Sequence, residues 1–248
     1  MLLAAAALTL GLFEFYVLAK KRDLKPDAVV GYLAAAALFV VFYIVRPWQL
    51  LDMLFLLQAV LIVFIPAAMI AATLRGAPFE KMLASTGATI LGVLYVVFLG
   101  GHLVSLRTGF PQSLSADLLS FFFLVLMGAD TGAFYAGKTL GKHKLAPTIS
   151  PGKTWEGVIG GVVASLVMAT LAHYWFFREL PLKIALPLAA VMTVIGILGD
   201  LTESALKRGS GAKDAAKLLP GHGGILDRLD SLLFNAPLIY YFGRLYFG

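Results

Sequence analysis

The sequence contains no cysteine, so disulfides, zinc–thiolate sites and thiol nucleophiles are excluded together. Charged residues are also scarce, because they make up 14% of the 248 residues whereas 60% are hydrophobic. A soluble domain is usually about 45–50% apolar, and a single water-soluble core could not absorb this excess. The composition therefore predicts a protein that places much of its surface in lipid.

Long apolar runs recur along the chain with charges only at their edges, and each is about long enough to cross a bilayer as a helix. The alternating segments of a membrane barrel are missing. We therefore expect an all-α, polytopic integral membrane protein with about eight transmembrane helices and a polar cavity facing the cytoplasm. The expected helices are 2–19, 28–45, 50–74, 82–99, 114–136, 158–177, 184–201 and 231–246.

No repeat, low-complexity tract or flexible linker divides these runs. We therefore expect one membrane domain over 1–248, with N-terminal helices in 1–113 and catalytic helices and loops in 114–248. The first run has neither a basic leader nor a small-residue cleavage site, so it resembles a retained helix more than a signal peptide.

Lysines and arginines are concentrated in alternate loops, and the richer set is expected on the cytoplasmic side. The net charge of +6 would suggest nucleic acid in a soluble protein, but these residues lie between apolar runs, where anionic headgroups or substrates are better partners. We therefore expect no nucleic-acid binding. The basic loops are 20–25, 75–81, 138–153 and 207–228.

Carboxylates gather around the last of these loops. Asp200 ends an apolar run, with Glu203, Ser204 and Lys207 on the same face if the helix continues, and Asp227 and Asp230 repeat the pattern before the last run. A carboxylate at the membrane boundary is costly unless it is paired or bound to a cation. Two such helix ends could hold Mg²⁺, which prefers oxygen ligands and shares them with phosphates. The alternative is simple ion pairing with Lys207, Arg208, Lys213 and Arg228.

A glycine-rich turn, Pro220-Gly221-His222-Gly223-Gly224, precedes the last run. Glycines let backbone N–H groups approach an anion, and the helix start behind them adds partial positive charge, so a phosphate would fit there. Such turns also serve as ordinary connectors. His222 could act as a general acid or phosphate donor, although a lone histidine is more often structural.

The loop around 138–153 supplies a second group of polar residues. Asp130 lies within an apolar run and is a functional-site hypothesis by default, with burial opposite a basic partner as the alternative. Ser150 opens a polar turn that leads into a helix, and Lys144 and Lys153 can face phosphates. Gly157 and Gly161 form a small-residue pair that favours close helix packing rather than chemistry.

These blocks resemble the phosphatidate cytidylyltransferases, also called CDP-diacylglycerol synthases. The stretch DTGAFYAGKTLGKHKLAPTISPGKTWEG from Asp130 is similar to one family block, while Ala215-Ala216 departs from the small polar residue or glycine that is common in the family. Family members commonly have another hydrophobic helix upstream. The family's C-terminal signature is matched by Ser204, Lys207-Arg208, Lys213-Asp214, Pro220 to Gly224, Asp227-Arg228 and Asp230.

The resemblance implies that CTP and phosphatidate in the bilayer react to give CDP-diacylglycerol and pyrophosphate, with Mg²⁺ as cofactor and with or without a second cation. It implies a multi-pass protein of the bacterial inner membrane with its active site on the cytoplasmic side, and small-residue helix faces suggest a homodimer. The expected metal ligands are Asp200 and Asp227, supported by Asp214 and Asp230. The other expected catalytic residues are Lys207, Lys213, His222 and Arg228. The expected substrate-binding residues are Arg208, Gly221, Gly223, Gly224, Asp130, Lys144, Ser150 and Lys153.

Two other functions stay open at this point. A CTP-dependent polyprenol or lipid kinase would transfer the γ-phosphate to a hydroxyl and release CDP. A cation-coupled transporter could use Asp130 and the boundary acids as an ion path, although the hydropathy shows no repeated pair of broken helices.

Overall fold

The computed structural model describes residues 2–44, 50–76, 79–212 and 224–248. Over these residues the chain is almost entirely helical, which confirms the all-α expectation; only a short two-stranded hairpin departs from it. The elements are α1 (Leu2–Lys20), α2 (Ala28–Ile44), α3 (Leu50–Arg75), η2 (Phe79–Lys81), α4 (Met82–Gly92), the π-helical η3 (Val93–Phe98), α5 (Leu99–Thr108), α6 (Gln112–Leu140), β1 (Lys144–Ala146), β2 (Ser150–Thr154), α7 (Trp155–Trp175), α8 (Leu182–Gly209) and α9 (Leu226–Tyr246).

Six of the described helical segments are long and apolar enough to cross a membrane, so the chain is a multi-pass membrane protein. The expected helices at 28–45 and 231–246 exist as α2 and α9, but α2 is shorter and α9 is not among the six. The expected count of eight therefore stays a prediction. The six are Leu2–Lys20, Leu51–Arg75, Phe79–Thr108, Gln112–Leu140, Trp155–Trp175 and Leu182–Gly209.

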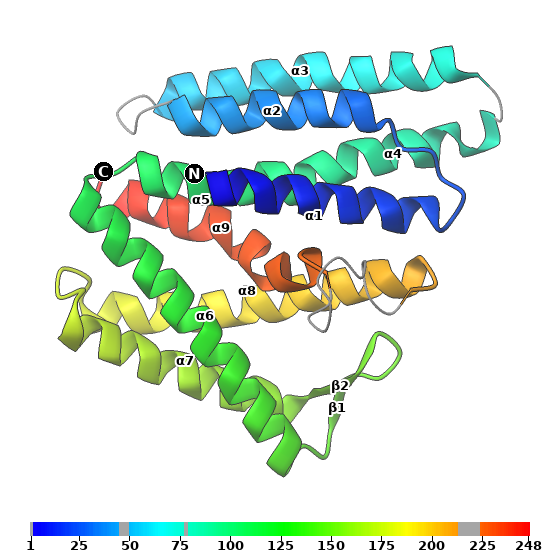
Figure 1. Ribbon diagram of the computed structural model, residues 1–248. Coiled ribbons are helices and arrows are strands. Elements are labelled where there is room, and N and C mark those ends of the chain that lie inside the picture. The colour runs from blue at the N-terminus through cyan, green and yellow to red at the C-terminus, as the bar shows by residue number, and fades with distance from the viewer. Residues whose placement is uncertain (1, 45–49, 77–78, 213–223) are drawn as a thin grey trace.

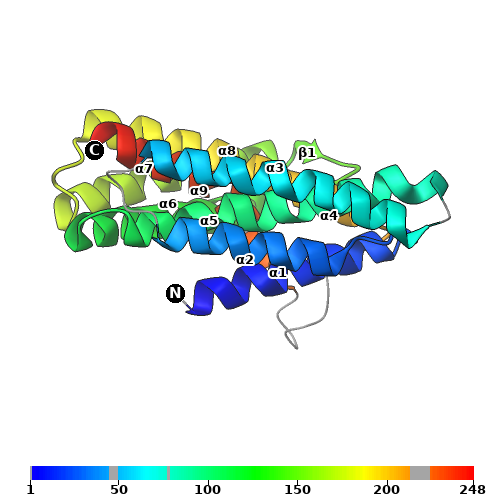
Figure 2. The same cartoon turned by 90° about the horizontal axis from the view of Figure 1, so that it is seen from above.

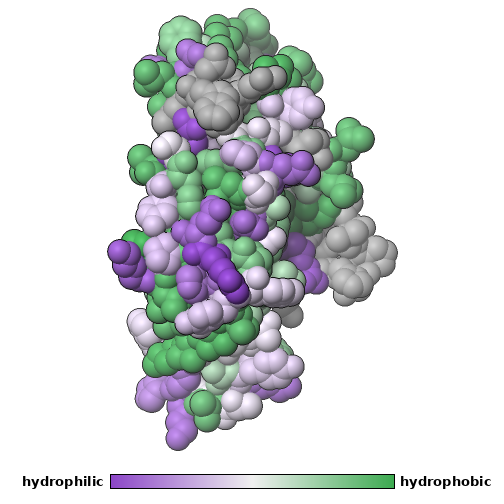
Figure 3. Space-filling view, turned by 90° about the vertical axis from the view of Figure 1, so that its left-hand side faces the viewer, coloured by the Kyte–Doolittle hydropathy of each residue, from purple (hydrophilic) through white to green (hydrophobic). Residues whose placement is uncertain are grey.

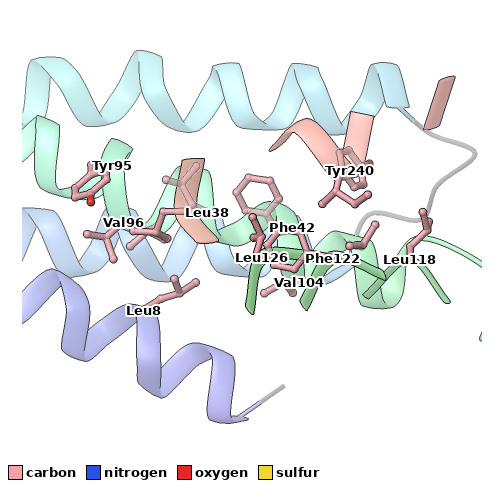
Figure 4. Close-up of a cluster of buried hydrophobic side chains, with 14 of the residues drawn as sticks. Leu8, Leu38, Phe42, Tyr95, Val96, Val104, Leu118, Phe122, Leu126 and Tyr240 are labelled. Carbon is pink, nitrogen blue, oxygen red and sulfur yellow. The ribbon is translucent and has the colours of Figure 1, made fainter. Parts of the chain in front are cut away.

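The helices run roughly along one long axis and form three groups (Figures 1 and 2). Helices α2 and α3 pair on one side, α6, α7 and α8 lie on the other, and α1, α4, α5 and α9 lie between them. The buried core occupies this middle region: Leu38, Phe42 and Phe122 have no exposed surface, and they lie near Tyr95 and Tyr240 (Figure 4). Helix α3 instead turns large side chains outward, such as Phe55, which is 70% exposed, as expected of a lipid-facing helix.

Glycines let α6 and α7 approach each other closely. A Cβ atom at Gly160 would lie 2.2 Å from the Ala136 Cβ, and one at Gly132 would lie 2.4 Å from the Ala164 Cβ. A Cβ atom at Gly157 would lie 3.0 Å from the Ala133 carbonyl oxygen. A Cβ atom at Gly161 would lie 3.1 Å from the Ala129 carbonyl oxygen, so the packing role expected for Gly157 and Gly161 is confirmed. The close approach fixes the C-terminal half of α6 against the first turns of α7, next to the hairpin.

The turns that follow α1, α3 and α6 lie at the same end of the molecule as the end of α8 (Figure 1). The described parts of the four basic loops therefore share one end, as the charge pattern predicts. An ion pair between Arg75 and Asp27 joins two of these turns. At the opposite end, where both termini lie, hydrophilic side chains gather in the middle of the face between hydrophobic surface above and below (Figure 3).

Candidate active site

A cavity of about 680 Å³ opens at the end of the molecule that carries the hairpin. Its walls come from α6, the β1–β2 hairpin, α7, α8 and α9, so segments distant in sequence meet there. The cavity brings together six of the residues predicted from the sequence. They are Asp130, Ser150, Lys153, Asp200, Asp227 and Asp230.

The hairpin positions Lys153 over this cavity. Strands β1 and β2 are antiparallel, with Lys144 opposite Thr154, and the Thr154 hydroxyl then caps α7 by accepting the Gly157 N–H at 3.1 Å. At the base of the hairpin, His143 Nδ1 lies 2.6 Å from Glu156 Oε1. The short strands are thus anchored at the start of α7, which holds Lys153 in place.

Asp200 is held by two partners. Its Oδ2 atom lies 2.6 Å from Lys153 Nζ, and its Oδ1 atom accepts a hydrogen bond from the Ser204 hydroxyl at 3.3 Å. Helix α8 continues through Ser204 and Lys207 to Gly209, so the face expected from the spacing of these residues exists. The basic partner of Asp200 is nevertheless Lys153 of the hairpin. Lys153 was not among the lysines and arginines of 207–228 that were expected to pair with these acids.

Asp227 is fixed in a similar way from the other side of the cavity. Its Oδ1 atom accepts a hydrogen bond from Lys207 Nζ at 2.7 Å, and its Oδ2 atom accepts the Gly224 N–H at 2.8 Å. Lys207 Nζ also lies 2.5 Å from Glu203 Oε2, and the Glu203 side chain is fully buried. Burial opposes ionisation of Asp227, but the bonds from Lys207 and Gly224 outweigh it and lower the pKa of this carboxyl.

Asp230 lies in the first turn of α9 with other carboxylates nearby. Burial, together with the negative charges of Asp200 and Asp130, raises the pKa of Asp230 to about 7, although its Oδ1 atom accepts the Ser231 N–H. The cavity therefore concentrates negative charge beyond what its lysines neutralise. A cation would relieve this repulsion.

Mg²⁺ prefers oxygen ligands, and each aspartate that lines the cavity offers carboxylate oxygens. Among the residues that the structure describes, however, no three acidic or histidine side chains lie close enough together to form a metal site. Protein sites for Mg²⁺ commonly supply only one or two carboxylates and leave the remaining positions to phosphates and water. Mg²⁺ binding by Asp200 and Asp227 therefore stays a prediction, in which these two acids would supply the protein ligands.

Three other predicted residues, Lys144, Arg208 and Arg228, are not among the residues that line the cavity. Lys144 is exposed on β1, and Arg228 is exposed on α9. Arg208 donates through Nε to the Ile149 carbonyl oxygen at 3.3 Å, so it ties the end of α8 to the hairpin. The roles expected for these residues toward substrate stay predictions. Lys213, Asp214, Gly221, His222 and Gly223 lie outside the described residues.

The N–H groups at the start of α9 donate to protein carboxylates. Gly224 donates to Asp227, while Ile225 and Leu226 donate to Glu14 of α1. Gly224 was expected to give a substrate phosphate access to the backbone; its N–H donates to Asp227 in the structure, and the contact with a phosphate stays a prediction. Glu14 was not predicted as a site residue, although it is an acid within an apolar run, the same signal that predicted Asp130.

The fold and the cavity define a multi-pass helical membrane protein whose paired aspartates and lysines meet at one end. The chain belongs to the cytidylyltransferase family, because residues 1–246 match the model of that family. It is 47% identical over 131 residues to a phosphatidate cytidylyltransferase of Haemophilus influenzae, an alignment covering 50% of this chain and 45% of the relative.

Two further relatives carry the same name. The Bacillus subtilis protein is 49% identical over 118 residues, covering 48% of this chain and 44% of the relative. A Staphylococcus aureus protein is 48% identical over 117 residues, covering 47% of this chain and 45% of the relative. The chain spans a little under half the length of the curated relatives it matches.

Proposed function

We propose that this protein transfers a cytidylyl group from CTP to phosphatidate and so forms CDP-diacylglycerol and pyrophosphate. The observation that carries the proposal is the meeting of Lys153–Asp200 and Lys207–Asp227 at one cavity of a membrane protein. Membership of the cytidylyltransferase family and the shared name of its relatives support it.

The reaction is an in-line displacement at phosphorus. An oxygen of the phosphatidate phosphate forms a bond to the α-phosphorus of CTP, and the bond from that phosphorus to the oxygen bridging the β-phosphorus breaks. Pyrophosphate leaves with the electron pair of the broken bond. The attacking phosphate is already ionised, so no strong general base is needed and catalysis rests on positioning and charge neutralisation.

The residues of the cavity suit these tasks. Lys153 lines the cavity beside Asp200 and would contact a substrate phosphate there, whereas Lys207 does not line the cavity but places its ammonium group against Asp227, which does. Asp200 and Asp227 would hold Mg²⁺, with Asp130 and Asp230 beside them and Asp214 as a further predicted ligand. When bound, Mg²⁺ would neutralise phosphate charge and orient the pyrophosphate leaving group.

The setting follows from the same proposal. Phosphatidate would reach the cavity from the bilayer and CTP from the cytoplasm, which assigns the end with the basic loops to the cytoplasmic face of a bacterial inner membrane. The homodimer and a second cation stay predictions.

The test follows two labels of CTP in purified protein mixed with phosphatidate-containing micelles and Mg²⁺. The proposal predicts that an α-phosphate label enters the lipid and that a γ-phosphate label is released as pyrophosphate. A γ-label in the lipid would instead identify a lipid kinase. No Mg²⁺-dependent consumption of CTP would contradict both enzymes and favour a transporter.

A further inference from the structure

A carboxyl group on α1 reaches the start of α9. The Glu14 side chain is fully buried; its Oε1 atom accepts the Ile225 N–H at 3.0 Å and its Oε2 atom accepts the Leu226 N–H at 2.7 Å. The first N–H groups of a helix have no partner within the helix, so a buried helix start needs acceptors from elsewhere. Glu14 supplies them from a helix more than 200 residues away in the chain.

Glu14 and Asp227 share this helix start between them. A Cβ atom at Gly224 would lie 2.7 Å from Glu14 Oε2 and 3.0 Å from Asp227 Oδ2, so the two carboxylates enclose a position that suits glycine. The Gly224 N–H donates to Asp227, and the next two N–H groups donate to Glu14. The backbone leading into Asp227 is therefore held on both sides.

This arrangement continues into the cavity. Asp227 follows directly after the capped residues, and its Oδ1 atom accepts a hydrogen bond from Lys207 Nζ. Lys207 in turn pairs with the buried Glu203. A displacement of the α9 start would move Asp227 away from Lys207, because Lys207 belongs to α8 and is paired there with Glu203. Misplacement of reacting groups by about 1 Å can lower a rate by a factor on the order of 100.

We propose that Glu14 is a positioning residue for the proposed cytidylyl transfer, because it fixes the start of α9 and thereby the Asp227–Lys207 pair. The inference rests on the proposed function. Glu14 lines neither the cavity nor any other part of the substrate site that the described residues form, so it acts through α9.

Helix α1 has an independent anchor, which gives the experiment its control. Two residues after Glu14, the buried Tyr16 hydroxyl donates to the Thr89 carbonyl oxygen at 3.1 Å. Tyr16→Phe removes one buried hydrogen bond of α1 without touching α9. Glu14→Gln keeps the size of the side chain but leaves only one oxygen acceptor for two N–H groups.

The experiment measures two quantities in wild type, Glu14→Gln and Tyr16→Phe, each purified in detergent. One is hydrogen exchange of the amides at 225 and 226, and the other is kcat and KM for CTP per folded enzyme. We expect Glu14→Gln to raise exchange at these amides and to lower kcat by roughly 10- to 100-fold, with a much smaller change in KM. Tyr16→Phe should change neither quantity appreciably.

Unchanged exchange in Glu14→Gln would overturn the contact itself. Raised exchange with unchanged kcat would overturn the positioning role and leave a purely structural cap. An equal loss of kcat in Tyr16→Phe would also overturn the inference, since any damage to α1 would then suffice. A wild-type protein without turnover would refute the proposed function, and the exchange measurement would still report on the cap.

Discussion

Lys153 Nζ lies 2.6 Å from Asp200 Oδ2, so an ion pair between two residues that line the candidate active site joins the hairpin to α8. The two side chains are partly buried, with 22% and 40% of their surfaces exposed, so the pair is reachable by a ligand but not fully solvated. Such a lysine can exchange its carboxylate partner for a phosphate at modest cost. The pair thus links the hairpin, absent from the sequence-based expectation, to the chemistry.

The ion pair predicts a large effect of Lys153→Ala. The substitution removes a cation from the cavity and leaves Asp200 without its partner, so we expect kcat/KM to fall by roughly 100- to 1,000-fold. The measurement is CTP turnover with phosphatidate in micelles. Lys183→Ala is the matched control, because Lys183 is exposed in the first turn of α8 and does not line the cavity. Similar losses in the two variants would argue against a specific role for Lys153.

The raised pKa of Asp230 predicts a pH dependence of stability. This carboxyl has a pKa of about 7 in the folded protein and an ordinary value of 3.8, so the folded form binds the extra proton between these values. Its contribution therefore destabilises the fold progressively as the pH rises from about 4 to about 7. We expect the melting temperature, measured in detergent without Mg²⁺, to depend less on pH between about 4 and about 7 in Asp230→Asn than in wild type. Identical profiles for the two proteins would show that Asp230 titrates normally.

The close approach of α6 and α7 predicts that Gly160 tolerates no side chain. A Cβ atom there would lie 2.2 Å from the Ala136 Cβ and 2.9 Å from the Gly132 carbonyl oxygen. We expect Gly160→Ala to destabilise the protein by about 1–3 kcal/mol, measured as a lower melting temperature. Gly87→Ala tests the same substitution in α4, where a Cβ atom would meet nothing within 4 Å. A Gly160→Ala protein as stable as the Gly87→Ala protein would contradict this packing.

Hydropathy predicts the helices well because lipid leaves the backbone few alternatives. The expected helix 184–201 corresponds to α8, which extends to Gly209 and carries Lys207 on the face that its spacing from Asp200 indicates. The hairpin over 144–154 was not predicted, since its short polar strands show no alternation and are held by tertiary contacts such as that from Arg208 to Ile149.

The sequence predicted which residues meet at the site better than it predicted which of them form ion pairs. Sidedness of the loops correctly brings Asp200 and Asp227 to one cavity. Which lysine each acid contacts depends on the packing of α8 against the hairpin and α9, and no spacing in the sequence encodes it. The cap from Glu14 to α9 was missed for the same reason, because its partners are backbone groups more than 200 residues away.

The most direct test of the central claim is the transfer of an α-phosphate label from CTP to phosphatidate by wild type and by Asp227→Asn. Asparagine keeps the shape of the side chain but removes the charge that pairs with Lys207 and would hold Mg²⁺. We predict label in CDP-diacylglycerol with wild type and none above background with Asp227→Asn, while both proteins elute from size exclusion as the same folded species. Near-normal labelling by Asp227→Asn would contradict the assignment of this cavity as the place of reaction.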